Sequence, residues 1–215
     1  MAPLIACLSD FFAGIENKEI IVIKLGTNGL VKNDAPLPSV LSVAAARYVL
    51  RLRRQIEFLG QFERYYLPTE DYDPKAIAVN GLDETRITSK RQGCNYPKHF
   101  KDDADSLTSY CSGVHLFVGH NIDLFEAKFL PWLTNSENKT FDLMKESVNI
   151  VCLEPDDCTY SDSWKWPTLY ELLHFYGIPI PDEYPMSGIT SVKSIAAIFQ
   201  VMLSYSGIRR IRLTS

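Results

Sequence analysis

The chain has 215 residues and a mass of 24.4 kDa, which is enough for one domain with a sizeable core. Its 46% apolar and 22% charged residues are typical of a globular protein and exclude a disordered or fibrous chain. Twenty-two basic residues against 26 acidic ones give a net charge of −4, which disfavours a basic surface that coats nucleic acid but leaves room for a local basic groove.

The compartment is indicated by the first residues and by the cysteines. The opening MAPLIACLSDFFAG has no basic segment and contains Asp10, which is untypical of a signal peptide. The five cysteines are odd in number and scattered, so we expect free thiols and a cytoplasmic location. No apolar run reaches the roughly 18 residues of a membrane-spanning helix, and we expect no membrane partner.

Three strands are predicted in the first third of the chain. The run 19–25 (EIIVIKL) is continuous and β-branched, as in a central strand buried on both faces, and turn residues follow it. From Val40 the pattern is strand-like, and over 47–53 apolar residues alternate with arginines. A third alternating run covers 61–67, and Gly60 before it favours an antiparallel pair.

The remainder of the chain is mainly helical. One further buried strand is predicted over 114–118, and the polar, irregular stretch 153–166 predicts a long surface loop. Helical spacing of apolar residues predicts four helices: 98–111, 123–133 with Asp123 as its N-cap, 168–176, and one that begins near residue 190.

This order of elements indicates the fold class. Three early strands followed by alternating helices and strands are typical of an α/β fold, in which a mixed sheet has helices on both faces. We expect one domain over 19–207, with an N-terminal extension over 1–18 and a C-terminal tail over 208–215.

Four segments carry motifs that occur in the same order in a known family. They are the apolar strand with its turn over 20–30 (IIVIKLGTNGL), the strand over 118–126 with its His-Asn and Phe-Glu pairs, the WPTLYEL segment over 166–172, and the closing helix over 191–203. In order and spacing they resemble the DEDD 3′–5′ exonucleases, the proofreading superfamily of RNase H-like fold. The resemblance implies a mixed five-stranded sheet flanked by helices.

The resemblance also implies where a catalytic site would be. Such enzymes hydrolyse phosphodiester bonds with two divalent ions that are held by four acidic residues, and a His or Tyr of the last motif is the general base. This chain departs from the pattern at nearly every position. The first Asp is Lys24, the Glu two residues later is Gly26, and the second-motif Asp is Glu126. In the closing motif the base falls on Met186 and the last Asp falls on Ser191.

The charge at these positions decides the expected activity. In the family these four positions carry four negative charges. In this chain Lys24 carries one positive charge, Glu126 carries one negative charge, and Gly26 and Ser191 are uncharged, so the net charge of the four positions is zero. An ammonium group where a metal ion would lie disfavours binding of two divalent ions. We therefore expect no catalytic residue, no metal ligand unless it is Glu126, and no cofactor, although an active enzyme would need Mg or Mn. We also hypothesise that Lys24 replaces a metal ion and pairs with Glu126.

Residues beside the inherited site are candidates for contact with nucleic acid. A His-Asn pair after a strand more often fixes the turn, and an aromatic residue more often packs than stacks on a base, so each candidate has a structural alternative. The candidates are Thr27, Asn28, His120, Asn121 and Trp166.

These observations favour an inactive exonuclease-like domain that binds single-stranded nucleic acid or a protein partner. Because a fold does not by itself determine function, two alternatives stay open. One is a scaffold that dimerises through the edge over 48–67 or the tail over 208–213. The other is an active nuclease in which displaced ligands surround one metal ion, namely Asp83, Glu84, Asp123 and Glu126.

Overall fold

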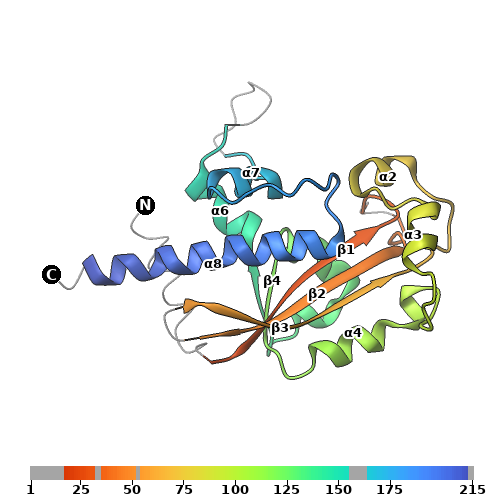
Figure 1. Cartoon of the computed structure of the whole chain (residues 1–215), viewed down its shortest axis with the longest axis horizontal. Helices are drawn as coiled ribbons and strands as arrows, with labels where there is room; N and C mark the ends of the chain where they lie inside the picture. The colour runs from red at the N-terminus through yellow and green to blue at the C-terminus, as the bar shows by residue number, and fades with distance from the viewer. Residues whose placement is uncertain (1–16, 32–34, 52–53, 155–163, 213–215) are drawn as a thin grey trace.

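The computed structural model describes residues 17–31, 35–51, 54–154 and 164–212, and it describes side chains up to residue 204 (Figure 1). A single mixed sheet of five strands has the order β3-β2-β1-β4-β5, which confirms the expected fold class. The strands are β1 (Glu19–Thr27), β2 (Val40–Leu50), β3 (Ile56–Tyr65), β4 (Leu116–Gly119) and β5 (Lys139–Asp142).

Strand direction places the carboxyl ends of three strands together. β1 pairs with β2, and β2 with β3, in antiparallel register, whereas β1–β4 and β4–β5 are parallel. The carboxyl ends of β1, β4 and β5 therefore lie at one edge of the sheet, where open α/β sheets bind their ligands.

Helices cover both faces of the sheet (Figure 1). α8 (Gly188–Arg212) crosses one face, with α6 (Leu143–Val151) and α7 (Leu169–Phe175) beside it. α4 (Ala104–Cys111) and the segment after β4 cover the other face. α2 (Pro74–Asn80) and α3 (Glu84–Lys90) lie near the carboxyl end of β1.

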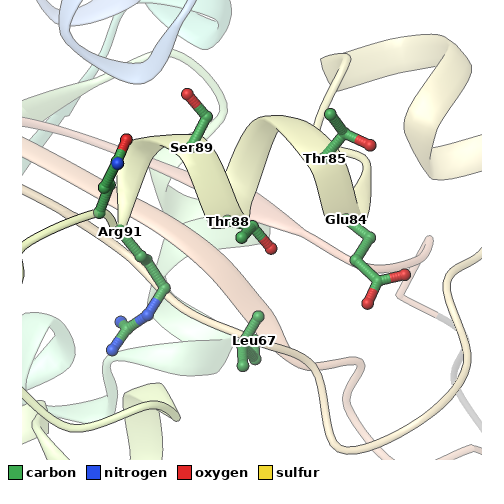
Figure 2. Close-up of a pocket in the computed structure, with 7 residues that line it drawn as sticks. Leu67, Glu84, Thr85, Thr88, Ser89 and Arg91 are labelled. Carbon is green, nitrogen blue, oxygen red and sulfur yellow. The ribbon is translucent and has the colours of Figure 1, made fainter.

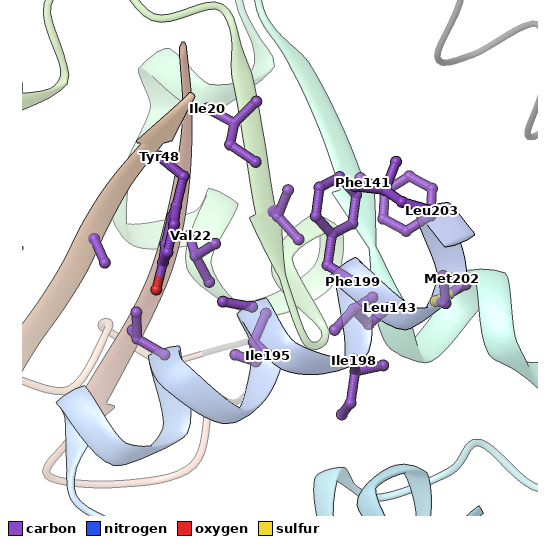
Figure 3. Close-up of a cluster of buried hydrophobic side chains, with 14 of the residues drawn as sticks. Ile20, Val22, Tyr48, Phe141, Leu143, Ile195, Ile198, Phe199, Met202 and Leu203 are labelled. Atoms are coloured by element: carbon purple, nitrogen blue, oxygen red, sulfur yellow. The ribbon is translucent and has the colours of Figure 1, made fainter. Parts of the chain in front are cut away.

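The central strand is buried on both faces, as its continuous apolar run predicts. Ile20 and Val22 point toward α8, whereas Ile21 and Ile23 point into the second core, because side chains alternate along a strand. Figure 3 shows the first of these cores, where α8 side chains such as Phe199 meet those of the sheet.

Short elements account for most differences from the sequence predictions. α2, α3, β5 and α6 were not predicted, because elements of four to nine residues show little periodicity. The predicted loop over 153–166 lies partly outside the described residues. α8 begins earlier than predicted and continues to Arg212, past the expected boundary at residue 207.

The predicted helix over 123–133 is wrong as a single helix. It divides into a π-helical turn, η3 (Ile122–Glu126), then α5 (Ala127–Phe129) and a 3₁₀ turn, η4 (Pro131–Thr134). The predicted N-cap is also wrong, because Asn121 precedes the turn, and Asp123 accepts hydrogen bonds from Thr140 and Lys145 instead. Pro131 has no N–H group to continue the helix.

The edge strand β3 is partly covered by side chains from other elements. Such contacts occupy backbone groups that a second chain would need for strand pairing, so they weigh against this edge as a dimer interface. Gln200 accepts from the Ile56 N–H (2.7 Å), the Tyr96 hydroxyl accepts from the Tyr65 N–H (3.0 Å), and the Tyr110 hydroxyl donates to the Gly60 carbonyl (2.9 Å).

Glu70 joins the loops at the end of β1 and makes stability depend on pH. Partial burial would raise its pKa, but hydrogen bonds from Ser39, Asn28 and Thr69 lower the pKa of Glu70 to about 2. A carboxyl group whose pKa is lower in the folded than in the unfolded chain stabilises the folded state at pH values above its unfolded pKa, here near 4.5. This stabilisation is lost as the pH falls toward 2.

Glu70→Gln should therefore lower the free energy of unfolding by about 1 kcal/mol at pH 7, a value that already allows for solvent screening. The loss should be smaller below pH 4.5. Urea unfolding at pH 7 and at pH 3 measures both values. The exposed Glu137→Gln is the control, and a Glu70→Gln cost that is independent of pH would contradict the assignment.

Among the described residues, none of the helices combines the length and the apolar character that crossing a bilayer requires.

Candidate functional site

The predicted ion pair between Lys24 and Glu126 forms at the carboxyl end of β1. Lys24 Nζ lies 2.8 Å from Glu126 Oε1, and the backbone N–H of Leu25 donates to the same oxygen at 3.3 Å. Lys24 Nζ also lies 5.1 Å from the centre of the Phe125 ring. The Glu126 side chain is fully buried, whereas that of Lys24 is 26% exposed. The two positions that the resemblance aligns with acidic residues thus hold opposite charges in contact.

The turn after β4 brings Glu126 to this position. β4 ends at Gly119, where a Cβ atom would lie 2.7 Å from the Cβ of Ile122, so only glycine allows so close a turn. Asn121 follows with a positive φ of 67°, a conformation that Asn tolerates better than most residues. The π-helical turn η3 then places Glu126 in contact with Lys24. Such turns are frequent at functional sites.

Asp142 fixes this turn and is a residue that the sequence analysis missed. Its carboxylate accepts from the backbone N–H groups of Asn121 (2.9 Å), Asp123 (3.2 Å) and Met144 (3.0 Å). Burial raises the pKa of Asp142, although these hydrogen bonds oppose the rise. The signal in the sequence is Phe-Asp-Leu-Met over 141–144, an apolar residue followed by an Asp that caps a helix, but β5 before it is only four residues long.

The electrostatics of Glu126 depend on Lys24. Burial raises the pKa of the Glu126 carboxyl, and the Lys24 charge and the Leu25 N–H oppose the rise. Its Oε2 atom has no hydrogen-bond partner among the described residues. Because an unpaired buried carboxylate is costly, the ammonium group of Lys24 stabilises the charged form of Glu126.

The side-chain space at Gly26 is already filled. A Cβ atom there would lie 2.5 Å from Ser42 Oγ and 2.8 Å from Leu82 Cδ1. Contacts below 3.0 Å require the neighbours to move, so a carboxylate side chain does not fit beside Lys24. The residues that occupy the space come from β2 and from the turn between α2 and α3.

The closing-motif positions belong to the packing of α8. Met186 packs against the core under α8, and its Sδ accepts a hydrogen bond from Ser194 Oγ at 3.6 Å. Ser191 is 8% exposed and lies in the first turn of α8. Neither side chain carries a carboxylate, and both contribute to the packing of α8.

The segment before α8 is held against the α2–α3 turn. Glu183 Oε1 accepts from Arg86 at 2.8 Å, and Glu183 Oε2 accepts from the Thr190 hydroxyl at 2.7 Å. A Cβ on Gly81 would lie 3.3 Å from Pro185, so the segment packs closely on that turn. These contacts fix the position of Met186.

The displaced ligands of the active-nuclease alternative do not come together. Asp83 caps α3 through the Arg86 N–H (2.7 Å), and Glu84 is exposed in the first turn of that helix. Asp123 accepts from the Thr140 hydroxyl (2.6 Å) and from Lys145 (3.3 Å). In the part of the chain that the structure describes, no three His, Cys, Asp or Glu residues are grouped to hold a metal ion.

Two of the nucleic-acid candidates have buried, engaged side chains. Thr27 is 5% exposed and Asn28 is 3% exposed. The Asn28 amide donates to Glu70 (3.1 Å) and to the Asp71 carbonyl (2.8 Å) and accepts from the Asp73 N–H (3.1 Å). The Thr27 hydroxyl donates to the Gly29 carbonyl (2.9 Å), so both side chains make hydrogen bonds that hold the loop after β1.

His120, Asn121 and Trp166 lie closer to solvent. His120 donates its Nε2–H to the Pro167 carbonyl at 2.8 Å, which attaches the segment before α7 to the turn after β4. Burial and the nearby Lys24 charge lower the pKa of His120 to about 4, so the ring is neutral at physiological pH. The side chain of Trp166, next to Pro167, is 47% exposed.

An open hollow lies elsewhere, against α3 (Figure 2). The Arg91 guanidinium, which lines the hollow, donates hydrogen bonds to the backbone carbonyls of Tyr65 and Tyr96 and so connects α3 to these two segments. The hollow shares no residue with the Lys24 site. Its lining residues are Leu67, Glu84, Thr85, Thr88, Ser89, Arg91 and Gln92.

Comparison with known proteins identifies the fold of the chain. No model of a known protein family matches the sequence, and no curated protein matches it. Solved structures do match: the chain has the fold of the 3′–5′ exonucleases, as its motifs suggested.

Three structures illustrate the likeness. Exonuclease X in complex with 5′ overhanging duplex DNA has a TM-score of 0.57 at 15% identity, over 87% of this chain and 93% of that one. E. coli Exonuclease I in complex with a 5cy-dA13 oligonucleotide has a TM-score of 0.58 at 16% identity, over 87% of this chain but only 42% of the Exonuclease I chain. Cell-death related nuclease 4 (CRN-4) has a TM-score of 0.59 at 15% identity, over 89% of this chain and 65% of that one.

The residues present do not fit the two metal ions of the exonuclease reaction. The ammonium group of Lys24 contacts the Glu126 carboxylate, where it repels a divalent cation, and no carboxylate fits at position 26. The arrangement is instead a neutral ion pair with a partly exposed ammonium group.

Proposed function

We propose that this domain is a catalytically inactive exonuclease-like module that binds single-stranded nucleic acid without cleaving it. The observation that carries the proposal is the 2.8 Å ion pair between Lys24 and Glu126. A positive charge in contact with the carboxylate repels a divalent cation from the position where the reaction would need one.

The binding half of the proposal is supported by the fold. Exonuclease X and Exonuclease I have been solved with DNA and with an oligonucleotide, and this chain has their fold. The partly exposed Lys24 and the exposed Trp166 offer a charge for phosphate and a ring for stacking. The free thiols of Cys94, Cys111 and Cys152 support a cytoplasmic location.

A nuclease assay tests the proposal. We expect labelled single-stranded DNA and RNA to remain intact with Mg or Mn, and to be retained by the protein in a parallel binding titration. Glu126→Gln is the control, since a contaminating nuclease would be unaffected by this change. Cleavage by the wild-type protein that Glu126→Gln abolishes would show an active enzyme instead.

Absence of both cleavage and binding would favour a protein partner. Exonuclease I, of which this chain covers 43%, has been solved in a complex with SSB-Ct as well as with an oligonucleotide. That outcome would overturn the nucleic-acid proposal.

A further inference from the structure

Arg64, near the end of the edge strand β3, has a guanidinium group that its neighbours hold in one orientation. Its Nη1 atom donates to both carboxylate oxygens of Asp103, at 2.7 Å and 2.5 Å. Its central carbon lies 4.9 Å from the centre of the Phe62 ring and 4.8 Å from the centre of the Tyr96 ring. A planar group held by two rings and a carboxylate loses little further freedom when it binds a ligand.

One edge of this guanidinium has donors that the protein does not use. A guanidinium has five N–H donors, and among the described residues the hydrogen bonds of Arg64 are those of Nη1 to Asp103. The Asp103 side chain is 4% exposed, whereas that of Arg64 is 28% exposed. Because Nη1 is bonded to the buried carboxylate, the Nε–Nη2 edge is left for contact with solvent. An arginine edge of this kind binds two oxygens of a phosphate or a carboxylate at once.

The free edge belongs to a different part of the molecule from the Lys24 site. Arg64 pairs across the sheet with Val43, and Val43 pairs with Leu25, both of which lie in the second core. Lys24 pairs with Ala44, which lies in the first core. Because paired residues share a face of a sheet, Arg64 and Lys24 leave the sheet on opposite faces.

The charge around Arg64 suits an anion, although the chain as a whole is acidic. The segment 86–105 has five basic residues against three acidic ones, a net charge of +2, whereas the whole chain has −4. Within this segment, the central carbon of Arg91 lies 4.6 Å from the centre of the Tyr96 ring, which Arg64 also contacts. Asp103 balances the charge of Arg64, so the second guanidinium leaves a positive charge beside the free edge.

We propose that the Nε–Nη2 edge of Arg64 binds a phosphate group in the backbone of single-stranded nucleic acid, as a second contact outside the inherited site. The inference rests on the proposed function, which supplies the strand. The Nε–H and Nη2–H groups donate to the two non-bridging oxygens of one phosphodiester group. A backbone contact of this kind is independent of base sequence, and it needs no divalent cation.

Binding of a labelled single-stranded oligonucleotide in excess EDTA, followed by fluorescence anisotropy at several salt concentrations, tests the contact. Arg64→Lys keeps a positive charge opposite Asp103 but removes the two-donor edge, and should weaken binding roughly tenfold. Arg64→Gln/Asp103→Asn removes both charges and should weaken binding to a similar extent. It should also reduce the slope of log affinity against log salt by about 0.7, the value for one phosphate contact on a single strand.

Arg51→Lys is the matched control for these variants. Arg51 is also an arginine paired with a carboxylate, that of Glu57, but both side chains are about half exposed. This change should alter neither the affinity nor the salt slope. An equal loss in Arg51→Lys and Arg64→Lys would overturn the assignment to Arg64.

A measurement on the wild-type protein keeps the test valid if the Arg64 variants do not fold. With ¹⁵N-labelled arginine, the Arg64 Nε–H resonance should shift on addition of the oligonucleotide and also on addition of inorganic phosphate. An oligonucleotide with an uncharged methylphosphonate backbone should leave the resonance in place, because it lacks the anionic oxygens.

The outcomes separate this contact from the proposed function. If the oligonucleotide binds but the Arg64 resonance does not move, the contact fails while the proposed function stands. If poly-glutamate shifts the resonance at lower concentration than the oligonucleotide does, or if inorganic phosphate shifts it and the oligonucleotide does not, the edge binds another anion and the proposal is overturned. If the oligonucleotide does not bind at all, the proposed function fails as well.

Discussion

Lys24→Met should destabilise the domain by about 3 kcal/mol at neutral pH, because it leaves the fully buried Glu126 carboxylate without a counter-charge. Urea unfolding measures the cost. Glu126 can escape part of it by binding a proton, since burial already raises its pKa. The cost of Lys24→Met should therefore fall as the pH is lowered and grow as the pH is raised.

The double variant Lys24→Met/Glu126→Leu should recover most of the lost stability and lie within about 1 kcal/mol of the wild type. An apolar pair of similar volume avoids both buried charges. The matched control is Arg51→Met, which breaks an exposed pair with Glu57 (49% and 56% exposed) and should have no measurable effect. If the losses in unfolding free energy from Lys24→Met alone and from Glu126→Leu alone added up in the double variant, the two side chains would not act as a pair.

Gly26→Ala should destabilise the domain by about 2 kcal/mol, because the new methyl group meets Ser42 and Leu82 at distances below 3.0 Å. Gly26→Glu, which introduces the acidic residue of the exonuclease motif, should cost more. Thermal unfolding compares the variants.

Gly60→Ala is the control for the Gly26 changes. Gly60 is also a strand glycine, but a Cβ atom there has no neighbour within 4 Å. This variant should be neutral or slightly stabilising, since alanine loses less backbone freedom on folding. Equal effects at both positions would mean that Ser42 and Leu82 move aside easily, and that a carboxylate fits beside Lys24 after all.

Together the two positions explain why one substitution does not rebuild a two-metal site. Replacing Lys24 by Asp removes the ammonium group but leaves position 26 without space for a second carboxylate. The neutral ion pair and the filled space are independent obstacles, one electrostatic and one steric.

The sequence by itself predicted the sheet and the identity of the ion pair. The β-branched run over 19–25 predicted a strand buried on both faces, because no residue in its centre prefers water. The order of the motifs placed Lys24 at the end of the first strand and Glu126 in the first turn of the neighbouring helix, and the structure confirms their contact.

The tertiary structure alone decided which neighbours matter. Asp142 comes from a four-residue strand, and Ser42 and Leu82 fill the space at Gly26 from distant segments. Thr27 and Asn28 are candidates by position, yet both are buried, and Asn28 is bonded to the loop over 70–73. Periodicity along a chain reports which face of an element is apolar, whereas the occupant of a space between elements depends on contacts that are distant in sequence. For that reason the charge of this site was predictable and its remaining volume was not.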